Sequence, residues 1–143
     1  MNVLAFTPRL EVGKTDQFAN YVSLDDLFEK SDIIALCCPL NLETEKIINQ
    51  QNITKMKNGA WIINTGRGGL IDEQALADAL KSGKIAFAGV DVLSAEPPPA
   101  DNPLLSASNC YITPHNAWTT KEARQRLIDI AYYYMSKFLG DCP

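Results

Sequence analysis

The chain has 143 residues and a net charge of −4; 46% of its residues are hydrophobic and 21% are charged. This length suits one globular domain, and an acidic chain without a basic run argues against nucleic acid as a partner. No apolar run reaches the roughly 18 residues that a membrane span needs, and no signal peptide opens the chain, so we expect no membrane association.

The four cysteines form neither a Cys-x-x-Cys pair nor a cluster with histidine. Cys37 and Cys38 lie in an apolar run, where we interpret them as small buried side chains. Unpaired, scattered cysteines are typical of a reducing compartment. We therefore predict a cytoplasmic protein without a zinc or other metal site.

The first predicted elements are short. The apolar run Asn2–Phe6 predicts a strand, and Tyr21-Val22 predicts a second extended piece. Ser23 is a suitable N-cap for a helix of about two turns, with Asp26 three residues later.

The middle of the chain predicts two strands separated by helical pieces. The run Asp32–Cys38, which Pro39 ends, suits a buried parallel strand. Short helical pieces are expected within Glu43–Lys57. After a turn at Gly59, the run Ala60–Asn64 predicts another buried strand.

A capped helix follows. Asp72 is a suitable N-cap, apolar residues recur at helical spacing, and Gly83 is a suitable end. The next strand is expected over Ala86–Val92. The segment Glu96–Pro103 is too rich in proline for a helix or strand and is predicted to be an irregular loop.

The last elements are a short strand over Cys110–Thr113 and a long helix over 121–139, opened by Thr119 or Thr120. Strands that alternate with helices predict an α/β fold with a parallel sheet.

Unusual polar residues follow the predicted strands. In parallel α/β sheets, ligands bind outside the carboxyl ends of the strands. Arg67 lies in a glycine-rich turn after one strand, Asp91 ends the next, and His115 follows the last. The pattern alone therefore predicts a binding edge that contains these three residues.

At these residues the chain resembles a known family. The segment "INTGRGGLIDEQALADALKSGKIAFAGVDVLSAEPPPADNPLL", followed by "YITPHNAW", is similar to the D-isomer-specific 2-hydroxyacid dehydrogenases, and within them to the glycerate dehydrogenase and hydroxypyruvate reductase branch. The resemblance runs from about Val3 to about Phe138. It implies hydride transfer between NAD or NADP and a small 2-hydroxy or 2-oxo acid.

The resemblance implies three catalytic residues. Arg67 would bind the carboxylate and carbonyl oxygen of the substrate through its planar fork of donors. His115 would act as general acid and base, and Glu96 would orient it and favour the imidazolium form. Taken alone, Arg67 could be a solvated loop residue, His115 a structural histidine and Glu96 a loop acid; their order and spacing together favour the catalytic interpretation.

The resemblance also implies cofactor contacts. Cys38, Pro39 and Thr44 would lie near the adenine and ribose, although Thr44 could equally be a helix N-cap. Near the nicotinamide end, the resemblance places Thr65, Gly66, Asp91 and Ala117, with Asp91 accepting a hydrogen bond from the carboxamide.

One departure concerns the choice of cofactor. Many members that use NAD have an acid after the strand that matches Asn2–Phe6, where it binds the ribose hydroxyls. Here that place is taken by Thr7, with Arg9 two residues on. An acid would repel a 2′-phosphate and an arginine could pair with one, so NADP is expected to serve at least as well as NAD.

A larger departure is the missing G-x-G-x-x-G turn; "GRGGLI" does not fit, because Ile71 takes the last glycine position. Met1 resembles an internal methionine of the family. We therefore expect residues 1–143 to be a partial NAD(P)-binding domain, the later part of a larger enzyme without its substrate domain. Its Rossmann-like doubly wound sheet would lack the first strand, so the chain alone should be inactive.

A second function remains open. Some relatives, the C-terminal-binding-protein corepressors, act as non-catalytic, dinucleotide-sensing interaction modules and keep a similar triad. The "HNAW" sequence and the "EPPPADNPLL" loop favour the metabolic branch. In both cases we expect a homodimer, through the long helix after His115 or through an exposed sheet edge.

Overall fold

The strands form two parallel sheets. The structure, a computed structural model, describes residues 1–8 and 12–140. The small sheet pairs β1 (Leu4–Ala5) with β2 (Asn20–Tyr21). The larger sheet has the order β3-β4-β5-β6, with every pair parallel, and consists of β3 (Ile33–Leu36), β4 (Ala60–Asn64), β5 (Ile85–Val90) and β6 (Cys110–Ile112). The predicted parallel α/β fold is confirmed.

The doubly wound sheet is partial. In a sheet of order 3-2-1-4-5-6, the first strand lies between the second and the fourth. Here β1 and β3 match the second and fourth strands, and within the described residues they belong to separate sheets. The strand that would pair with both is not among these elements, as the sequence predicted.

Local capping explains where the helices begin and end. α1 (Leu24–Lys30) begins after Ser23, whose hydroxyl accepts a hydrogen bond from the Asp26 amide. α3 (Glu73–Ser82) begins after Asp72 and ends at Gly83, which adopts φ +77°. α2 (Gln50–Lys55) is the one α-helix within the predicted helical segment 43–57.

The apolar core lies on one face of the larger sheet. Ile62 in β4 and Ala88 in β5 are fully buried, together with Leu76 of α3. The same cluster includes Phe28 of α1 and Ile53 of α2. The first three helices therefore cover one face of the sheet.

The other face of this sheet is open, which corrects one prediction. Ile33 and Tyr111 are 56% and 66% exposed, and the ring of Phe87 lies 5.0 Å from that of Trp61 and 5.3 Å from that of Tyr111. The run Asp32–Cys38 was expected to form a buried strand, but its strand alternates between exposed and buried residues. An apolar run shows that a strand can be buried, not that a partner covers both sides.

The prediction that the adjacent residues Cys37 and Cys38 are buried is also wrong in part. Cys37 is exposed and Cys38 is half-buried, because they follow the last residue of β3 rather than lying within it. Both are free thiols, as is Cys110.

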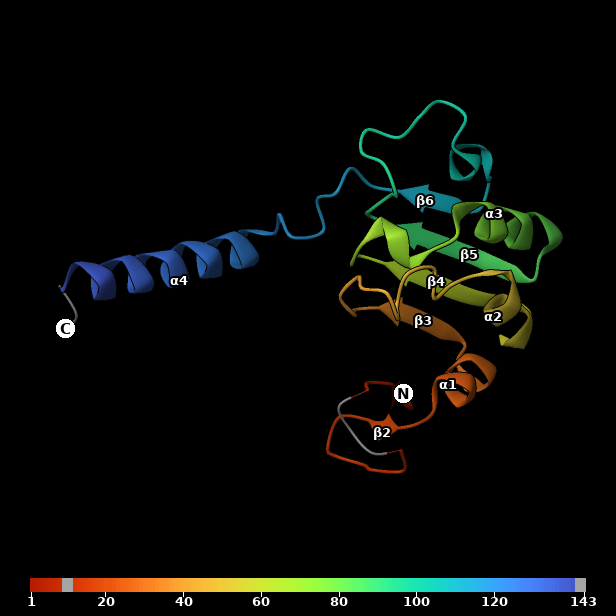
Figure 1. Cartoon of the computed structure of the whole chain (residues 1–143), viewed down its shortest axis with the longest axis horizontal. Coiled ribbons are helices and arrows are strands. Elements are labelled where there is room, and N and C mark those ends of the chain that lie inside the picture. Colours follow the sequence, from red (N-terminus) through yellow and green to blue (C-terminus); the bar gives the residue numbers. More distant parts are fainter. Residues whose placement is uncertain (9–11, 141–143) are drawn as a thin grey trace.

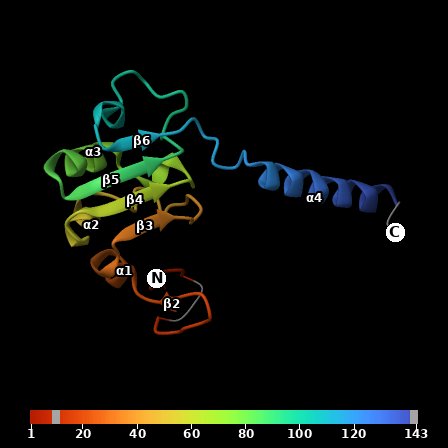
Figure 2. The ribbon, with the colours of Figure 1, turned by 180° about the vertical axis from the view of Figure 1, so that it is seen from behind.

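α4 (Lys121–Leu139) begins after Thr120, as predicted, and ends at Gly140 with φ +80°. It extends away from the sheets (Figures 1 and 2), and none of its residues is buried. α4 therefore covers neither face of the larger sheet. No helix in the described part of the chain is long and apolar enough to cross a membrane.

Candidate active site

The loop after β4 is built on a buried asparagine. Asn64 is fully buried; its side-chain amide donates to the Arg67 carbonyl (3.0 Å), and its side-chain oxygen accepts from the Gly66 amide (3.0 Å). A buried amide with both groups satisfied fixes the backbone around it. Asn64 therefore shapes the turn that presents Arg67.

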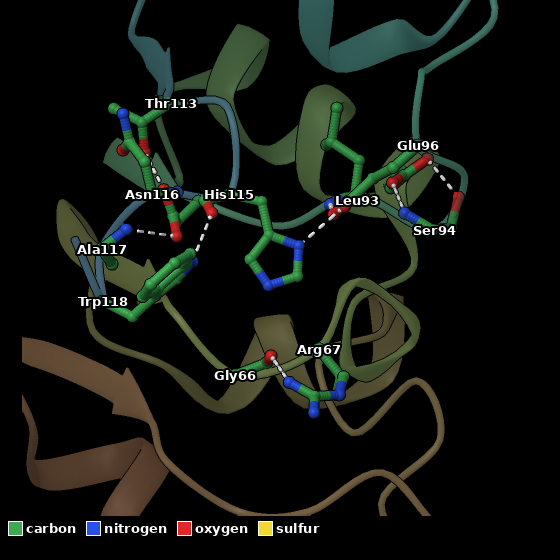
Figure 3. A network of polar contacts seen from close by, with 12 residues as sticks. Gly66, Arg67, Leu93, Ser94, Glu96, Thr113, His115, Asn116, Ala117 and Trp118 are labelled. Carbon is green, nitrogen blue, oxygen red and sulfur yellow. Dashed lines mark hydrogen bonds and ion pairs between the residues drawn. The ribbon is translucent and has the colours of Figure 1, made fainter. Parts of the chain in front are cut away.

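The guanidinium of Arg67 lies at the surface of this turn. One of its nitrogens donates to the Gly66 carbonyl at 2.8 Å (Figure 3), and the residue is exposed. Among residues 1–8 and 12–140, no carboxylate forms an ion pair with it. The remaining donors of the fork are thus placed to take an anion from solution.

Gly68 brings the loop after β4 into contact with the backbone of Leu93 and Ser94. A Cβ atom on Gly68 would lie 2.0 Å from the carbonyl carbon of Leu93 and 2.4 Å from the amide of Ser94. Only glycine allows this approach. The loop that carries Arg67 is therefore packed directly on the loop that carries Glu96.

His115 and Glu96 form a close pair. Nδ1 of His115 lies 2.7 Å from Oε2 of Glu96, and the other carboxylate oxygen accepts from the Leu93 amide at 3.1 Å (Figure 3). The hydrogen bond from His115 and then that from Leu93 hold the pKa of Glu96 below its usual 4.5. Glu96 is therefore ionised at neutral pH and accepts a hydrogen bond from the protonated Nδ1 of His115, which leaves Nε2 for a substrate.

The ring of His115 points toward the loop that carries Gly66 and Arg67 (Figure 3). His115 itself adopts φ +52°, an uncommon conformation for a residue other than glycine. The His115 amide donates to the Thr113 carbonyl at 2.9 Å, and the indole nitrogen of Trp118 donates to the His115 carbonyl at 3.1 Å. Trp118 thus contacts the backbone of His115.

Asp91 holds the loop that carries His115. It is 5% exposed and accepts hydrogen bonds from the Thr113 hydroxyl and from the amides of Asn116 and Ala117, both at 2.9 Å. Burial opposes its ionisation, but these hydrogen bonds outweigh it and lower the pKa of Asp91 below its usual 3.8. Asp91 is therefore a buried carboxylate with both oxygens engaged; a hydrogen bond to a nicotinamide carboxamide stays a prediction.

The pair Glu96 and His115 lines a cleft at the carboxyl end of the larger sheet. Pro97, Pro98 and Pro114 supply apolar parts of its lining, to which Asp91 and Thr113 also contribute. Thr65 and Ala117 are exposed and Gly66 is half-buried at the same edge. The structure thus brings the predicted catalytic residues and the predicted nicotinamide contacts to one edge.

The residues predicted for the adenosine end follow strands of two separate sheets. The Thr44 hydroxyl donates to the Pro39 carbonyl (2.7 Å) and accepts from the Asn41 amide (2.9 Å), so Thr44 is not the N-cap of an α-helix. Burial raises the pKa of the Cys38 thiol. Thr7 follows β1 of the small sheet, and Arg9 lies outside the described residues.

Sequence reasoning missed two residues that shape the site. Asn64 was predicted only as the end of a strand; its signal is a polar amide at the end of an apolar run. Glu73 accepts hydrogen bonds from Ser94 and Asn102, residues 21 and 29 positions away. No local pattern marks such partners.

Three comparisons place this chain among known proteins. The sequence model described as "D-isomer specific 2-hydroxyacid dehydrogenase, NAD binding domain" matches residues 1–117. A hydroxypyruvate reductase from Blautia hydrogenotrophica is 52% identical over 143 residues, which is all of this chain and 44% of that protein.

Two solved structures share the fold. The D-lactate dehydrogenase of Lactobacillus jensenii with NAD+ superposes with a TM-score of 0.85 at 32% identity, covering 99% of this chain and 46% of that one. An acyclic imino acid reductase, Bsp5, in complex with NADPH and D-Arg gives a TM-score of 0.85 at 35% identity, covering 100% and 45%. The chain spans less than half the length of these proteins.

Proposed function

Because the chain belongs to the D-isomer specific 2-hydroxyacid dehydrogenase family and matches its NAD-binding domain, we propose that it carries the catalytic edge of an NAD- or NADP-dependent oxidoreductase. The substrate is a small 2-oxo or 2-hydroxy acid such as hydroxypyruvate, glycerate or glyoxylate. The observation that supports this most strongly is the 2.7 Å contact between His115 and Glu96, beside the loop of Arg67. An imidazole, its carboxylate partner and an anion-binding arginine are the groups that reduction of a 2-oxo acid requires.

The residues present fit the nicotinamide end of a dinucleotide and not its pyrophosphate. Asp91 and half-buried Gly66 lie at the carboxyl edge of the sheet, where such cofactors bind. No G-x-G-x-x-G turn is present to hold a pyrophosphate. The nicotinamide, when bound, would supply or accept the hydride.

Each catalytic residue then has one task. Arg67 binds the carboxylate and polarises the carbonyl of the oxo acid through its fork of donors. During reduction, His115 donates the proton on Nε2 to the oxygen that becomes the hydroxyl; during oxidation it removes that proton. Glu96 keeps the proton on Nδ1 and stabilises the imidazolium.

We further propose that residues 1–143 are a partial NAD(P)-binding domain and that the substrate-binding domain is formed by residues other than these 143. The three free thiols of the described residues are consistent with a cytoplasmic, reducing setting. The exposed apolar residues of α4, such as Leu127, Tyr132 and Phe138, support a homodimer. Sedimentation at several concentrations measures the assembly.

The test is oxidation of NADH and NADPH by the full-length protein with hydroxypyruvate or glyoxylate, followed by loss of nicotinamide absorbance. We expect turnover with at least one of these acids. Cofactor binding without turnover of either acid, together with capture of a protein partner, would instead support the corepressor-type function.

A further inference from the structure

Glu73 connects the two ends of the loop that carries Glu96. Glu73 is the first residue of α3. One carboxylate oxygen accepts from the Ser94 amide (2.8 Å), and the other accepts from the Ser94 hydroxyl (2.9 Å) and the Asn102 side-chain amide (2.8 Å). Ser94 and Asn102 flank the proline-rich segment, so one side chain closes this loop at its base.

Both anchor points are themselves fixed. Asn102 is 5% exposed, and its side-chain oxygen caps the short helix 103–106 by accepting from the Leu104 amide at 3.0 Å. Ser94 follows Leu93, whose backbone touches Gly68 and whose amide donates to Glu96. Glu73 is therefore connected to the carboxylate of Glu96 through two adjacent residues: Glu73 binds Ser94, and the Leu93 amide binds Glu96.

We propose that Glu73 is a positioning residue: by holding Ser94 and Asn102 it keeps the carboxylate of Glu96 against Nδ1 of His115. This inference rests on the proposed function. Glu73 touches neither His115 nor the cleft, so it acts only through the loop. Three hydrogen bonds to one carboxylate are stronger than neutral ones and suit this purpose.

A purely structural role for Glu73 makes a different prediction. An acid in the first turn of a helix stabilises it through the helix dipole. Loss of that effect would loosen α3 and the sheet generally. Loss of positioning would instead loosen the loop alone, including the Leu93 amide, which Glu73 does not contact.

The first experiment measures amide hydrogen exchange in this chain. In Glu73→Ala, we expect exchange at Leu93 and Ser94 to rise about tenfold, the scale of one charged hydrogen bond, while Ala88 in β5 stays unchanged. Gln74→Ala, on the neighbouring exposed residue of α3, is the matched control and should change neither. Glu73→Gln keeps one acceptor oxygen and should restore most of the protection. Unchanged exchange at Leu93, or an equal rise at Ala88, would overturn the proposal.

The second experiment measures turnover of hydroxypyruvate by the full-length protein. Glu73→Ala should lower kcat about tenfold, since small displacements of catalytic groups are costly, and leave KM for the cofactor unchanged. The alkaline limb of the pH–rate profile for reduction should move to lower pH, because Glu96 no longer holds His115. A lower kcat with an unmoved profile would contradict positioning. If the unmodified protein shows no turnover, the proposed function fails, and the exchange experiment still decides what Glu73 does.

Discussion

The two ends of the predicted cofactor site differ in how they are built. At the nicotinamide end, the loops after β4, β5 and β6 are joined by hydrogen bonds and by the contact of Gly68 with Leu93. At the adenosine end, Thr7 follows a strand of the separate small sheet, and Thr44 bonds within its own turn. The groups for chemistry are thus organised within this chain, whereas the groups for holding a dinucleotide are not.

This difference shows which part of the function the chain can specify by itself. The hydrogen bonds that Asp91, Glu96 and Trp118 make to His115 and its loop lie within residues 91–118. A pyrophosphate needs backbone amides at a helix N-terminus next to the first strand, and that strand is not among the elements here. The predictions below test whether the chemical end is as complete as its geometry indicates.

The largest expected effect is at His115. His115→Ala in the full-length protein should lower turnover about 10²–10⁴-fold, the usual contribution of a general acid or base. Trp118→Phe is the comparison, because it removes the hydrogen bond to the His115 carbonyl but keeps an aromatic ring and the imidazole, and it should lower turnover far less. Turnover of His115→Ala within about threefold of the unmodified protein would exclude acid–base catalysis by this residue.

A smaller loss is expected at Arg67. Arg67→Lys keeps the positive charge but loses the planar fork, so kcat/KM should fall more than about tenfold with the fold intact. Lys46→Arg, at an exposed cation outside the cleft, is the control for exchanging one cationic side chain for the other and should leave kcat/KM unchanged. An unchanged kcat/KM would remove Arg67 from the site.

The adenosine end is tested by the choice of cofactor. We expect the full-length protein to use NADP at least as well as NAD, because Thr7 stands where many relatives carry an acid. Thr7→Asp should shift the ratio of kcat/KM values toward NAD by about tenfold, the scale of one charged contact. A strong preference of the unmodified protein for NAD would show that neither Thr7 nor Arg9 favours a 2′-phosphate.

The smallest expected effect is a shift of the pH–rate profile in Glu96→Gln. The pKa of Glu96 is lowered by His115, so Glu96 is an anion from mildly acidic pH upward and favours imidazolium throughout that range. Glu96→Gln removes the anion, and the alkaline limb of the pH–rate profile for reduction should move to lower pH. Rate profiles of the two proteins that superpose would show that the pair is not formed during turnover.

Features with a local cause were predictable from the sequence. Ser23, Asp72 and Thr120 cap their helices as expected, because a capping side chain bonds to an amide three residues on. The edge with Arg67, Asp91 and His115 was also predictable, since parallel strands present their carboxyl ends together.

Features that depend on distant partners were not predictable. The open face of β3 and the unburied α4 reflect which surfaces find a partner, and apolar spacing does not contain that information. The role of Asn64 depends on a turn that folds back over it. The pairing of His115 with Glu96 came from the resemblance, because no spacing rule joins residues 19 positions apart across a proline-rich loop.

The most direct test of the account compares this chain with a chimaera that adds the part of the Blautia hydroxypyruvate reductase outside the matched region. Calorimetric titration with NAD and NADP is combined with a turnover assay on hydroxypyruvate. The account predicts weak binding and no turnover for the 143-residue chain, and turnover that depends on His115 for the chimaera. Micromolar cofactor binding with measurable turnover by the chain alone, or a chimaera that His115→Ala leaves fully active, would contradict it.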